Sequence, residues 1–368
     1  MIGSPLLELL RMFKQFPGVA LCVLVLSSFG LGQSAWAEKV LNICVSSTDV
    51  KTIVEAVGGD EVSVTYFVKG PDDPHVVEPT RRMIQALAAA DLLVIVGNAM
   101  EIGWLPDMVE QVGRAELMPG GERKLDLSVN LRTIAGPEGR GVPGSFHPED
   151  NPHFLVDGVE GVKAAAAIRA KLTEIYPEQA DYFEANFRAF ASEVMTLMLG
   201  EALASRHEAE EFEELAIAVE RDELAAHLAQ HGGEELELGG TLAALEPYRD
   251  MKVIGDHDLW PYVARRYGVR VLGYMEPEPG VPPTAPHLAK LIGEMKQYGV
   301  RVILTVAYFD PRHAAFVQEQ VDGIIVPMAH NPESRPGTDT YLDMLRHNSS
   351  ALLAALEQAG SEPAAVTP

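Results

Sequence analysis

The chain has 368 residues, of which 47% are hydrophobic and 22% are charged, a composition typical of a folded globular protein. At this length, two lobes of ordinary domain size are expected rather than one compact core. The 29 basic and 53 acidic residues give a formal net charge of −24, which would repel a phosphate backbone. The composition therefore argues against disorder and nucleic-acid binding, and leaves small cations, neutral solutes and proteins as candidate partners.

The first 37 residues have the pattern of a signal peptide. A basic segment with Arg11 and Lys14 precedes an apolar run at residues 19–32, and a small-x-small cleavage site ends at Ala37. The apolar run is too short to span a membrane as a helix. Cys22 lies near the start of this run, whereas a lipidated cysteine would follow small residues at its end. We therefore expect cleavage after Ala37, no lipid anchor and no membrane span in the mature chain.

Beyond residue 37, short β-rich runs alternate with segments of helical periodicity, which is typical of an α/β fold. Residues 49–57 and 79–90 are expected to be helical. Residues 78–97 and 283–306 both run from a proline and a threonine through an amphipathic helix into a β-branched strand. This likeness favours two similar α/β lobes, each with a central, mainly parallel sheet. The predicted strands cover residues 40–45, 62–68 and 92–96 in the first lobe, and 252–254, 269–274, 302–306 and 323–326 in the second.

A helical region separates the two sets of strands. From Glu178 onward, apolar residues recur at steps of three and four, which marks one face of an amphipathic helix. Residues 199–250 then carry 14 acidic and 3 basic residues. The ordinary interpretation is a solvated helical surface, and the alternative is a weak metal-collecting role for His207, His227 and His231. The predicted organisation is a signal peptide (1–37), an N-terminal α/β lobe (38–177), one long linking helix (178–206), an acidic helical insertion (207–250), a C-terminal α/β lobe (251–358) and a disordered tail (359–368).

Three of the eleven histidines have settings in which open α/β folds place ligand groups, at strand ends or in rigid loops that open helices. His75 follows a predicted strand in the proline-rich loop VKGPDDPHVVEPT. His153 lies just before a helical stretch, in HPEDNPHFLVD, and His257 directly follows a strand, in KVIGDHDLWPY. Asp339, in RPGTDTYLDMLRHN, is a fourth candidate, although an aspartate before a helix is commonly only its N-cap.

The chain contains four segments of interest in order: Glu55 to Leu105, Asn151 to Asp157, Gly255 to Gly273 and Gly337 to Asn348. Together these segments resemble the zinc and manganese solute-binding proteins of bacterial ABC importers, and the resemblance covers nearly the whole chain after the signal peptide. It implies two α/β lobes joined by one long rigid helix, with the metal held in the cleft between the lobes by His75, His153, His257 and Asp339. It also implies a monomeric periplasmic protein that is not an enzyme and that delivers metal to an ABC permease in the inner membrane.

Two features depart from the pattern of this family. Zinc-type members often carry a histidine-rich loop between the first two ligands, but residues 118–149 contain a single histidine, His147. The acidic stretch of residues 199–250 also looks longer than the usual connection. The structure and role of that stretch are therefore not carried over from the family.

Three neutral imidazoles and one carboxylate favour Zn²⁺ as the cargo, since Mn²⁺ prefers a larger share of oxygen ligands. Manganese or another divalent metal is the alternative. Outside transport, a metal-dependent adhesin or a secreted zinc hydrolase would use similar ligands, although the sequence has no H-E-x-x-H motif. Asp256 and Asp258 flank His257 and either accept from its ring or face solvent. Glu78 and Glu101 are nearby carboxylates, and we take neither as a ligand.

Overall fold

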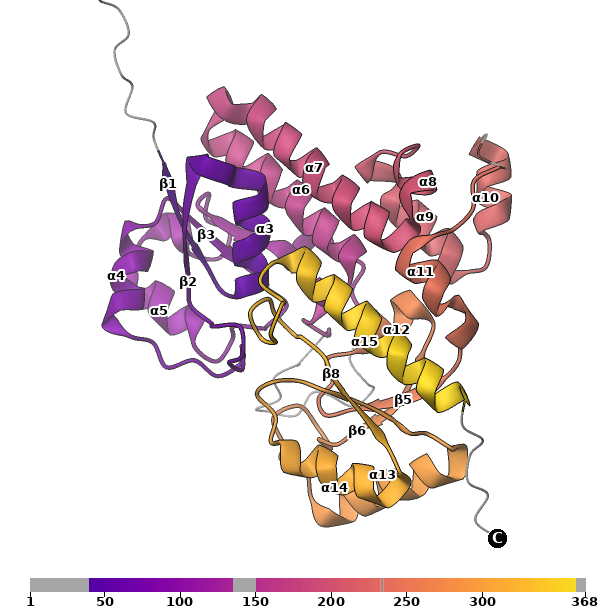
Figure 1. Cartoon of the computed structure of the whole chain (residues 1–368). Helices are drawn as coiled ribbons and strands as arrows, with labels where there is room; N and C mark the ends of the chain where they lie inside the picture. The colour runs from indigo at the N-terminus through magenta and orange to yellow at the C-terminus, as the bar shows by residue number, and fades with distance from the viewer. Residues whose placement is uncertain (1–39, 135–149, 232, 234, 362–368) are drawn as a thin grey trace, which may run out of the picture. The chain divides into compact units, whose positions relative to one another are not determined.

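The structure is a computed structural model that describes residues 40–134, 150–231, 233 and 235–361 (Figure 1). Residues from Leu41 onward form one compact unit. The predicted signal peptide, its cleavage site after Ala37 and residues 362–368 of the predicted tail lie outside the described residues.

The first sheet has four parallel strands in the order β2-β1-β3-β4. The strands are short and mostly apolar; β3 reads LLVI and all four of its residues are buried, as expected for a parallel sheet covered on both faces. The sequence did not predict β4, because its three residues, KLD, show no strand periodicity. The bounds are β1 (Leu41–Val45), β2 (Val62–Tyr66), β3 (Leu92–Ile95) and β4 (Lys124–Asp126).

The second sheet also has four parallel strands, in the order β6-β5-β7-β8. In both sheets the first strand lies between the second and the third, so the two sheets share one topology. This shared order confirms the predicted α/β class with two similar lobes. The bounds are β5 (Lys252–Gly255), β6 (Arg270–Tyr274), β7 (Val302–Thr305) and β8 (Ile324–Pro327).

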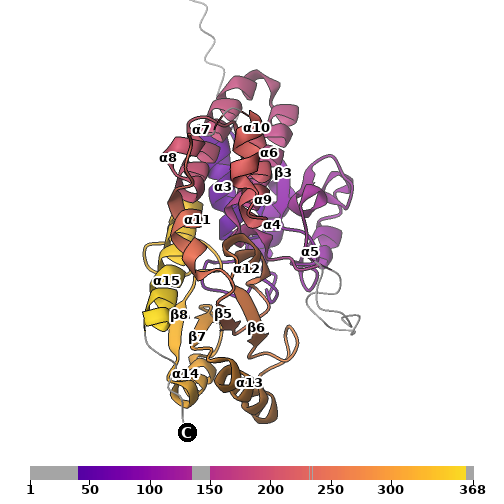
Figure 2. The same cartoon turned by 90° about the vertical axis from the view of Figure 1, so that its right-hand side faces the viewer.

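Each sheet has one face covered by its own pair of helices. Under α4 (Arg81–Ala89) and α5 (Leu105–Val112), a buried cluster contains Leu93 of β3 together with residues such as Leu87 and Met108. Under α13 (Ala285–Tyr298) and α14 (Pro311–Val321), a second cluster has the same arrangement. Figure 2 shows α13 and α14 at the end of the molecule opposite α6 and α7.

The other faces of the two sheets share one continuous core. This cluster joins residues of β1 and β3 to residues of β5 and β7 through several helices. It includes the largest fully buried side chain, Trp260, just before α12. A shared core of this kind resists separation of the lobes, because opening them would expose apolar surface at about 25 cal/mol per Å². These helices include α3 (Thr48–Gly58), α6 (Gly158–Ile175), α7 (Ala180–Leu199), α12 (Pro261–Tyr267) and α15 (Tyr341–Ser361).

The helical connection differs from the predicted single helix of residues 178–206. It contains two long helices, α6 and α7, which pack side by side (Figure 1). Helix α7 ends at Gly200, which has a φ of 84°, a conformation that glycine adopts without strain. An added Cβ at Gly200 would approach the backbone of Gly239 to 2.8 Å, so the close contact with that segment also requires glycine. A short helix, α8 (Glu201–Ala204), follows the break.

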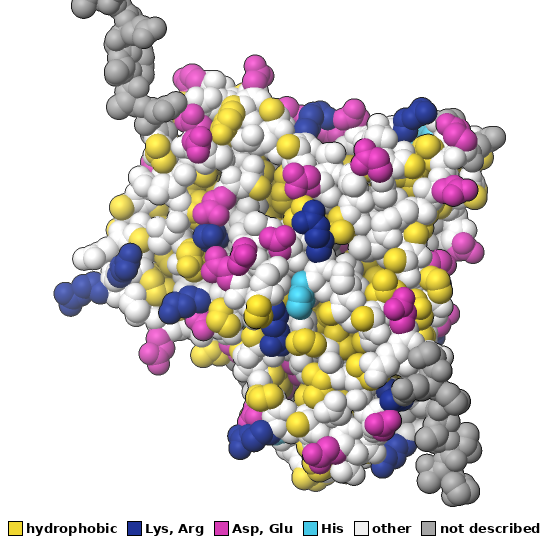
Figure 3. Space-filling view, viewed as in Figure 1, with side chains coloured by type: hydrophobic (Ala, Val, Ile, Leu, Met, Phe, Trp, Pro, Cys, Tyr) yellow, Lys and Arg dark blue, Asp and Glu magenta, His cyan; other side chains and the backbone are white. Residues whose placement is uncertain are grey.

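The acidic stretch that follows is helical, as expected. It contains α9 (Phe212–Glu220), α10 (Leu224–His231) and α11 (Gly240–Leu245). The start of the predicted tail is helical instead of disordered, because α15 continues to Ser361. Among the described helices, none is both long and apolar enough to cross a membrane. Acidic side chains are scattered over the face shown in Figure 3 and do not gather in one patch.

Candidate metal centre

The loop that carries His75 is fixed from both ends. It leaves β2 and ends at α4, where the Thr80 hydroxyl accepts a hydrogen bond from the backbone N–H of Met83 and caps the helix. The indole N–H of Trp104 donates to the carbonyl of Pro74 over 3.0 Å, next to His75. The His75 side chain is therefore held in one place, and the residue as a whole is 4% exposed.

His153 lies in a segment that hydrogen bonds hold against the second lobe. The backbone N–H of His153 donates to Oδ1 of Asn151 (2.9 Å), and Nδ2 of Asn151 donates to the carbonyl of Asp258 (2.7 Å). The Tyr262 hydroxyl donates to the carbonyl of Asn151 over 2.9 Å. Because Asp258 and Tyr262 follow β5, the position of His153 is tied to the loop that carries His257.

His257 follows β5 directly and is 2% exposed. The buried Asp256 carboxylate accepts from the backbone N–H of His257 (2.8 Å) and from that of Val306 after β7 (2.6 Å). Burial raises the pKa of Asp256 to about 7, although these backbone hydrogen bonds oppose the shift. Asp256 thus fixes the backbone where the first and third strands of the second sheet end.

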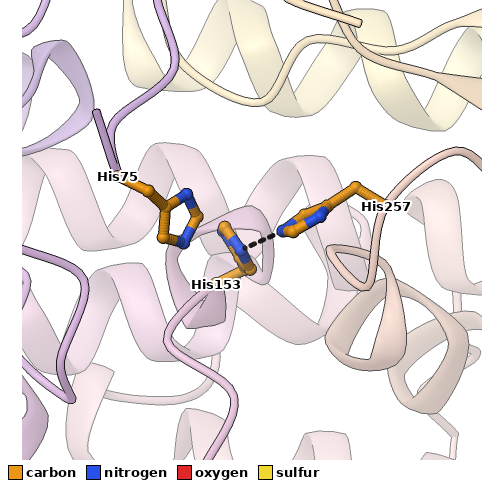
Figure 4. A group of neighbouring side chains, drawn as sticks. All are labelled: His75, His153 and His257. Carbon is orange, nitrogen blue, oxygen red and sulfur yellow. Dashed lines mark hydrogen bonds between the residues drawn. The ribbon is translucent and has the colours of Figure 1, made fainter. Parts of the chain in front are cut away.

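The three imidazoles converge on one point (Figure 4). They come from three separate segments, and one ring nitrogen of each lies within 4.8 Å of the others. Nε2 of His153 and Nε2 of His257 are 3.3 Å apart. Zn–N bonds of 2.0–2.1 Å in a tetrahedral site hold two nitrogens about 3.3 Å apart, so this pair already has the spacing that a zinc ion requires. The three buried ring nitrogens could hold one metal ion.

In two of these histidines, the ring atom Nδ1 lies at hydrogen-bond distance from a carboxylate. Nδ1 of His75 is 3.0 Å from Oδ1 of Asp73, and Nδ1 of His257 is 2.6 Å from Oε2 of Glu276. Burial alone would raise the pKa of Asp73, but its hydrogen bonds and electrostatic interaction with His75 outweigh that effect and lower it. Burial raises the pKa of Glu276 to about 7. With Nδ1 bound to a carboxylate, Nε2 of each neutral ring is the atom that can bind a metal.

The structure brings together three of the four predicted ligands and leaves the fourth apart. Asp339 is exposed and is not among the residues that could share a metal with the three histidines within the described chain. Asp339 is also not the cap of α15, because Thr340 accepts from the backbone N–H of Asp343 (3.2 Å) and so occupies that position. The resemblance implied Asp339 as a ligand through the matching segment Gly337 to Asn348, whereas the structure leaves its side chain exposed in the loop before α15.

The sequence indicates four other carboxylates, Asp256, Asp258, Glu78 and Glu101, as neighbours of the metal ligands. Asp256 binds backbone N–H groups, and Asp258 accepts from Nδ2 of Asn151 (3.2 Å), while Glu276 is the residue at Nδ1 of His257. Glu101 accepts from two backbone N–H groups at the end of β3, and Glu78 is exposed. The carboxylate at Nδ1 of His257 therefore comes from the segment after β6.

Sequence reasoning missed Asp73, Glu276 and His330. Asp73 had a signal, since an aspartate two residues before a histidine commonly forms a local turn. Glu276 is 19 residues from His257, and no sequence pattern indicates that the two residues meet. His330 is buried in the loop after β8, and its Nε2 donates to the carbonyl of Asp72 over 3.1 Å, which ties the His75 loop to the second lobe. Burial lowers the pKa of His330 to about 4, so its ring is neutral.

The family described as zinc-uptake complex component A, periplasmic, matches residues 43–201 and 234–355. The chain belongs to this family. The unmatched residues 202–233 include α9 and α10, so the first part of the acidic insertion lies outside the family pattern.

Two curated relatives carry metals in their names. The zinc-binding lipoprotein AdcA of Streptococcus pneumoniae is 22% identical over 343 residues, which cover 88% of this chain and 57% of AdcA. The manganese-binding lipoprotein MntA of Halalkalibacterium halodurans is 20% identical over 322 residues, covering 86% of this chain and 89% of MntA. The chain thus spans little more than half the length of the streptococcal relative.

Solved structures show the same fold. FpvC of Pseudomonas aeruginosa, solved in complex with Mn²⁺, has a TM-score of 0.62 at 20% identity, covering 88% of this chain and 100% of FpvC. A crystal structure of ZnuA has a TM-score of 0.60 at 21% identity, covering 87% of this chain and 98% of that one. At these identities the likeness supports the two-lobed architecture of this family member.

Proposed function

We propose that this chain captures a divalent metal ion, zinc in preference, outside the cytoplasm and delivers it to an ABC permease in the inner membrane. The observation that carries the proposal is the convergence of His75, His153 and His257 on one buried point. Membership of the zinc-uptake family supports the transport role, and the names of AdcA and MntA support a metal as cargo.

Zinc is preferred because the described ligand atoms are nitrogens. Neutral imidazole suits zinc, copper and nickel, whereas manganese favours carboxylate and carbonyl oxygens. Three histidines leave a coordination position for a further donor, as a four-coordinate zinc ion requires. Manganese is the second candidate, supported by the Mn²⁺-bound FpvC structure of the same fold.

Capture and delivery fit the site better than catalysis does. The three histidines are buried, since His75, His153 and His257 are 4%, 5% and 2% exposed. A hydrolase that acts on peptides or esters needs room for its substrate beside the metal, and side chains buried to this extent favour an enclosed ion instead. We therefore place this chain among binding proteins and expect a monomer.

Growth under zinc limitation tests the transport role. A bacterial strain that lacks its own zinc-binding component would carry the cognate permease and ATPase together with this chain, in medium containing a zinc chelator. We expect the wild type and His313→Ala to restore growth, since His313 lies on α14 outside the histidine cluster. We expect His257→Ala to fail. If added manganese but not zinc restored growth, the assigned cargo would be manganese. If the strain with His257→Ala grew as well as the strain with the wild type, the assignment of His257 to the metal site would be contradicted.

A further inference from the structure

Each of two ligand histidines is paired with its own carboxylate, one in each lobe. In the first lobe, Asp73 lies two residues before His75 and accepts both from its ring Nδ1 (3.0 Å) and from its backbone N–H (2.9 Å). One carboxylate oxygen therefore fixes the backbone turn and the ring together. The Asp73 side chain is 31% exposed, and the His75 side chain is 2% exposed.

In the second lobe, the pairing comes from the register of two neighbouring strands. Parallel strands β5 and β6 place Gly255 beside Tyr274. His257 and Glu276 each lie two residues further along, so both side chains reach the same edge of the sheet. Oε2 of Glu276 lies 2.6 Å from Nδ1 of His257 and also accepts from the backbone N–H of Gly280 (3.3 Å). Only 10% of the Glu276 side chain is exposed.

A carboxylate at Nδ1 determines what Nε2 can do. A carboxylate accepts hydrogen bonds and does not donate them when ionised, so it keeps the ring proton on Nδ1. The lone pair of the neutral ring is then on Nε2, which faces the centre of the cluster. Metal-binding histidines in general depend on such partners for their tautomer and orientation.

We propose that Asp73 and Glu276 are positioning residues for the metal, each of which fixes the tautomer and orientation of one ligand histidine. The proposal rests on the proposed metal-binding function of the three histidines. When both are ionised, the two carboxylates place two negative charges around a ligand set that is all nitrogen among the described residues. In that state their charge balances that of a divalent cation without placing an oxygen ligand on the metal.

Other buried carboxylates near the histidines do not have this geometry. The oxygens of Asp256 accept from the backbone N–H groups of His257 and Val306. The oxygens of Glu101 accept from the backbone N–H groups of Val96 and Gly97. Glu101 is therefore a matched control: a buried carboxylate of the same lobe as Asp73, with backbone partners in place of an imidazole.

The test compares Asp73→Asn, Glu276→Gln and Glu101→Gln with the wild type. An amide keeps the size of the side chain but can present N–H to Nδ1, which favours the tautomer with the proton on Nε2, the atom that must bind the metal. Zinc affinity is measured by competition with a chelator. Long-range ¹H–¹⁵N spectra of the metal-free proteins, labelled at histidine, report which ring nitrogen carries the proton.

We expect Asp73→Asn and Glu276→Gln each to lower zinc affinity by about 10- to 100-fold. Each variant should also change the ¹H–¹⁵N ring signals of one histidine only, which is His75 for Asp73→Asn and His257 for Glu276→Gln. Glu101→Gln should change neither readout, and thermal unfolding of all variants shows whether they are folded. Wild-type affinity in both amide variants, or ring signatures unchanged from the wild type, would overturn the proposal. If the wild type itself takes up no zinc, the proposed function fails, and the tautomer spectra still decide the positioning role.

Discussion

Nε2 of His153 and Nε2 of His257 lie 3.3 Å from each other, although they belong to segments 104 residues apart. A ring nitrogen binds a metal ion through its lone pair, and a proton on that atom occupies the same lone pair. Protons and metal therefore compete for the same site.

This competition predicts that zinc affinity falls as pH falls. Protons become more abundant and the metal must displace them, so the dissociation constant should rise steadily between pH 7.5 and pH 5.5. The measurement is a chelator competition at several pH values, corrected for the pH dependence of the chelator. An affinity independent of pH over this range would show that the metal does not bind through these nitrogens.

Asp339 should contribute little to metal binding. Its side chain is exposed and lies outside the histidine cluster, so Asp339→Ala should change zinc affinity by no more than about twofold, the usual effect of a surface substitution. His153→Ala, measured by the same competition, provides the comparison with a large loss. A large loss in Asp339→Ala as well would mean that the loop before α15 moves to the metal when it binds.

The sequence predicted the sheets better than it predicted the site. Seven of the eight described strands were predicted, because buried parallel strands are short apolar runs rich in β-branched residues, such as VILT in β7. The break at Gly200 was missed because the apolar period continues close to it, while a tertiary contact with Gly239 fixes the turn. Their places at strand ends and in rigid loops that open helices identified the three histidines that the structure brings together.

The carboxylates that lie at Nδ1 of two histidines are set to different degrees by the tertiary structure. Asp73 is a local neighbour of His75, so its role is visible in the spacing of the sequence. Glu276 reaches His257 only through the register of β5 with β6, and no sequence pattern records that register. The exposure of Asp339 likewise follows from the path of a loop, which the residue order does not determine.

A buried ion pair connects the two segments that carry His153 and His257. Arg266 of α12 donates from Nε and Nη2 to the carboxylate of Asp157, the N-cap residue of α6, over 2.9 Å each. Arg266→Met should lower the free energy of unfolding by about 3 kcal/mol, because it leaves a buried carboxylate with only the N-cap bond from the backbone N–H of Val159 (3.1 Å) and the longer contact to Arg265 (3.3 Å).

Urea unfolding of the metal-free protein measures this effect. Arg188→Met is the control, because Arg188 pairs with Glu184 at an exposed position and should matter far less. Arg266→Met should also weaken zinc binding, since the ion pair helps to hold the two histidine segments together. Equal stability of the two variants would contradict a structural role for the pair.

Glu101 should make the metal-free protein more stable in mild acid. Burial raises its pKa to about 7 from the ordinary value of 4.5, so the folded state binds a proton that the unfolded state does not between these pH values. The contribution of Glu101 to the free energy of unfolding is greatest below about pH 4.5 and is lost as pH rises to about 7. The difference between these limits is on the order of 3 kcal/mol.

Urea unfolding at pH 5 and pH 8 in the presence of a chelator measures this dependence. Glu101→Gln has no titrating group at this position, so its stability should fall less between pH 5 and pH 8 than that of the wild type. A fall of the same size in both proteins would show that Glu101 titrates in the ordinary range.

Metal stoichiometry tests the function of the histidine cluster most directly. Protein stripped with a chelator is dialysed against low concentrations of zinc, and the metal bound per chain is measured by mass spectrometry for the wild type, His257→Ala and His313→Ala. We expect one tightly held zinc ion per chain in the wild type and in His313→Ala, and a loss of affinity of more than about 100-fold in His257→Ala. A wild type that retains no zinc, or a His257→Ala variant that retains as much as the wild type, would contradict the assignment of these histidines as the metal site.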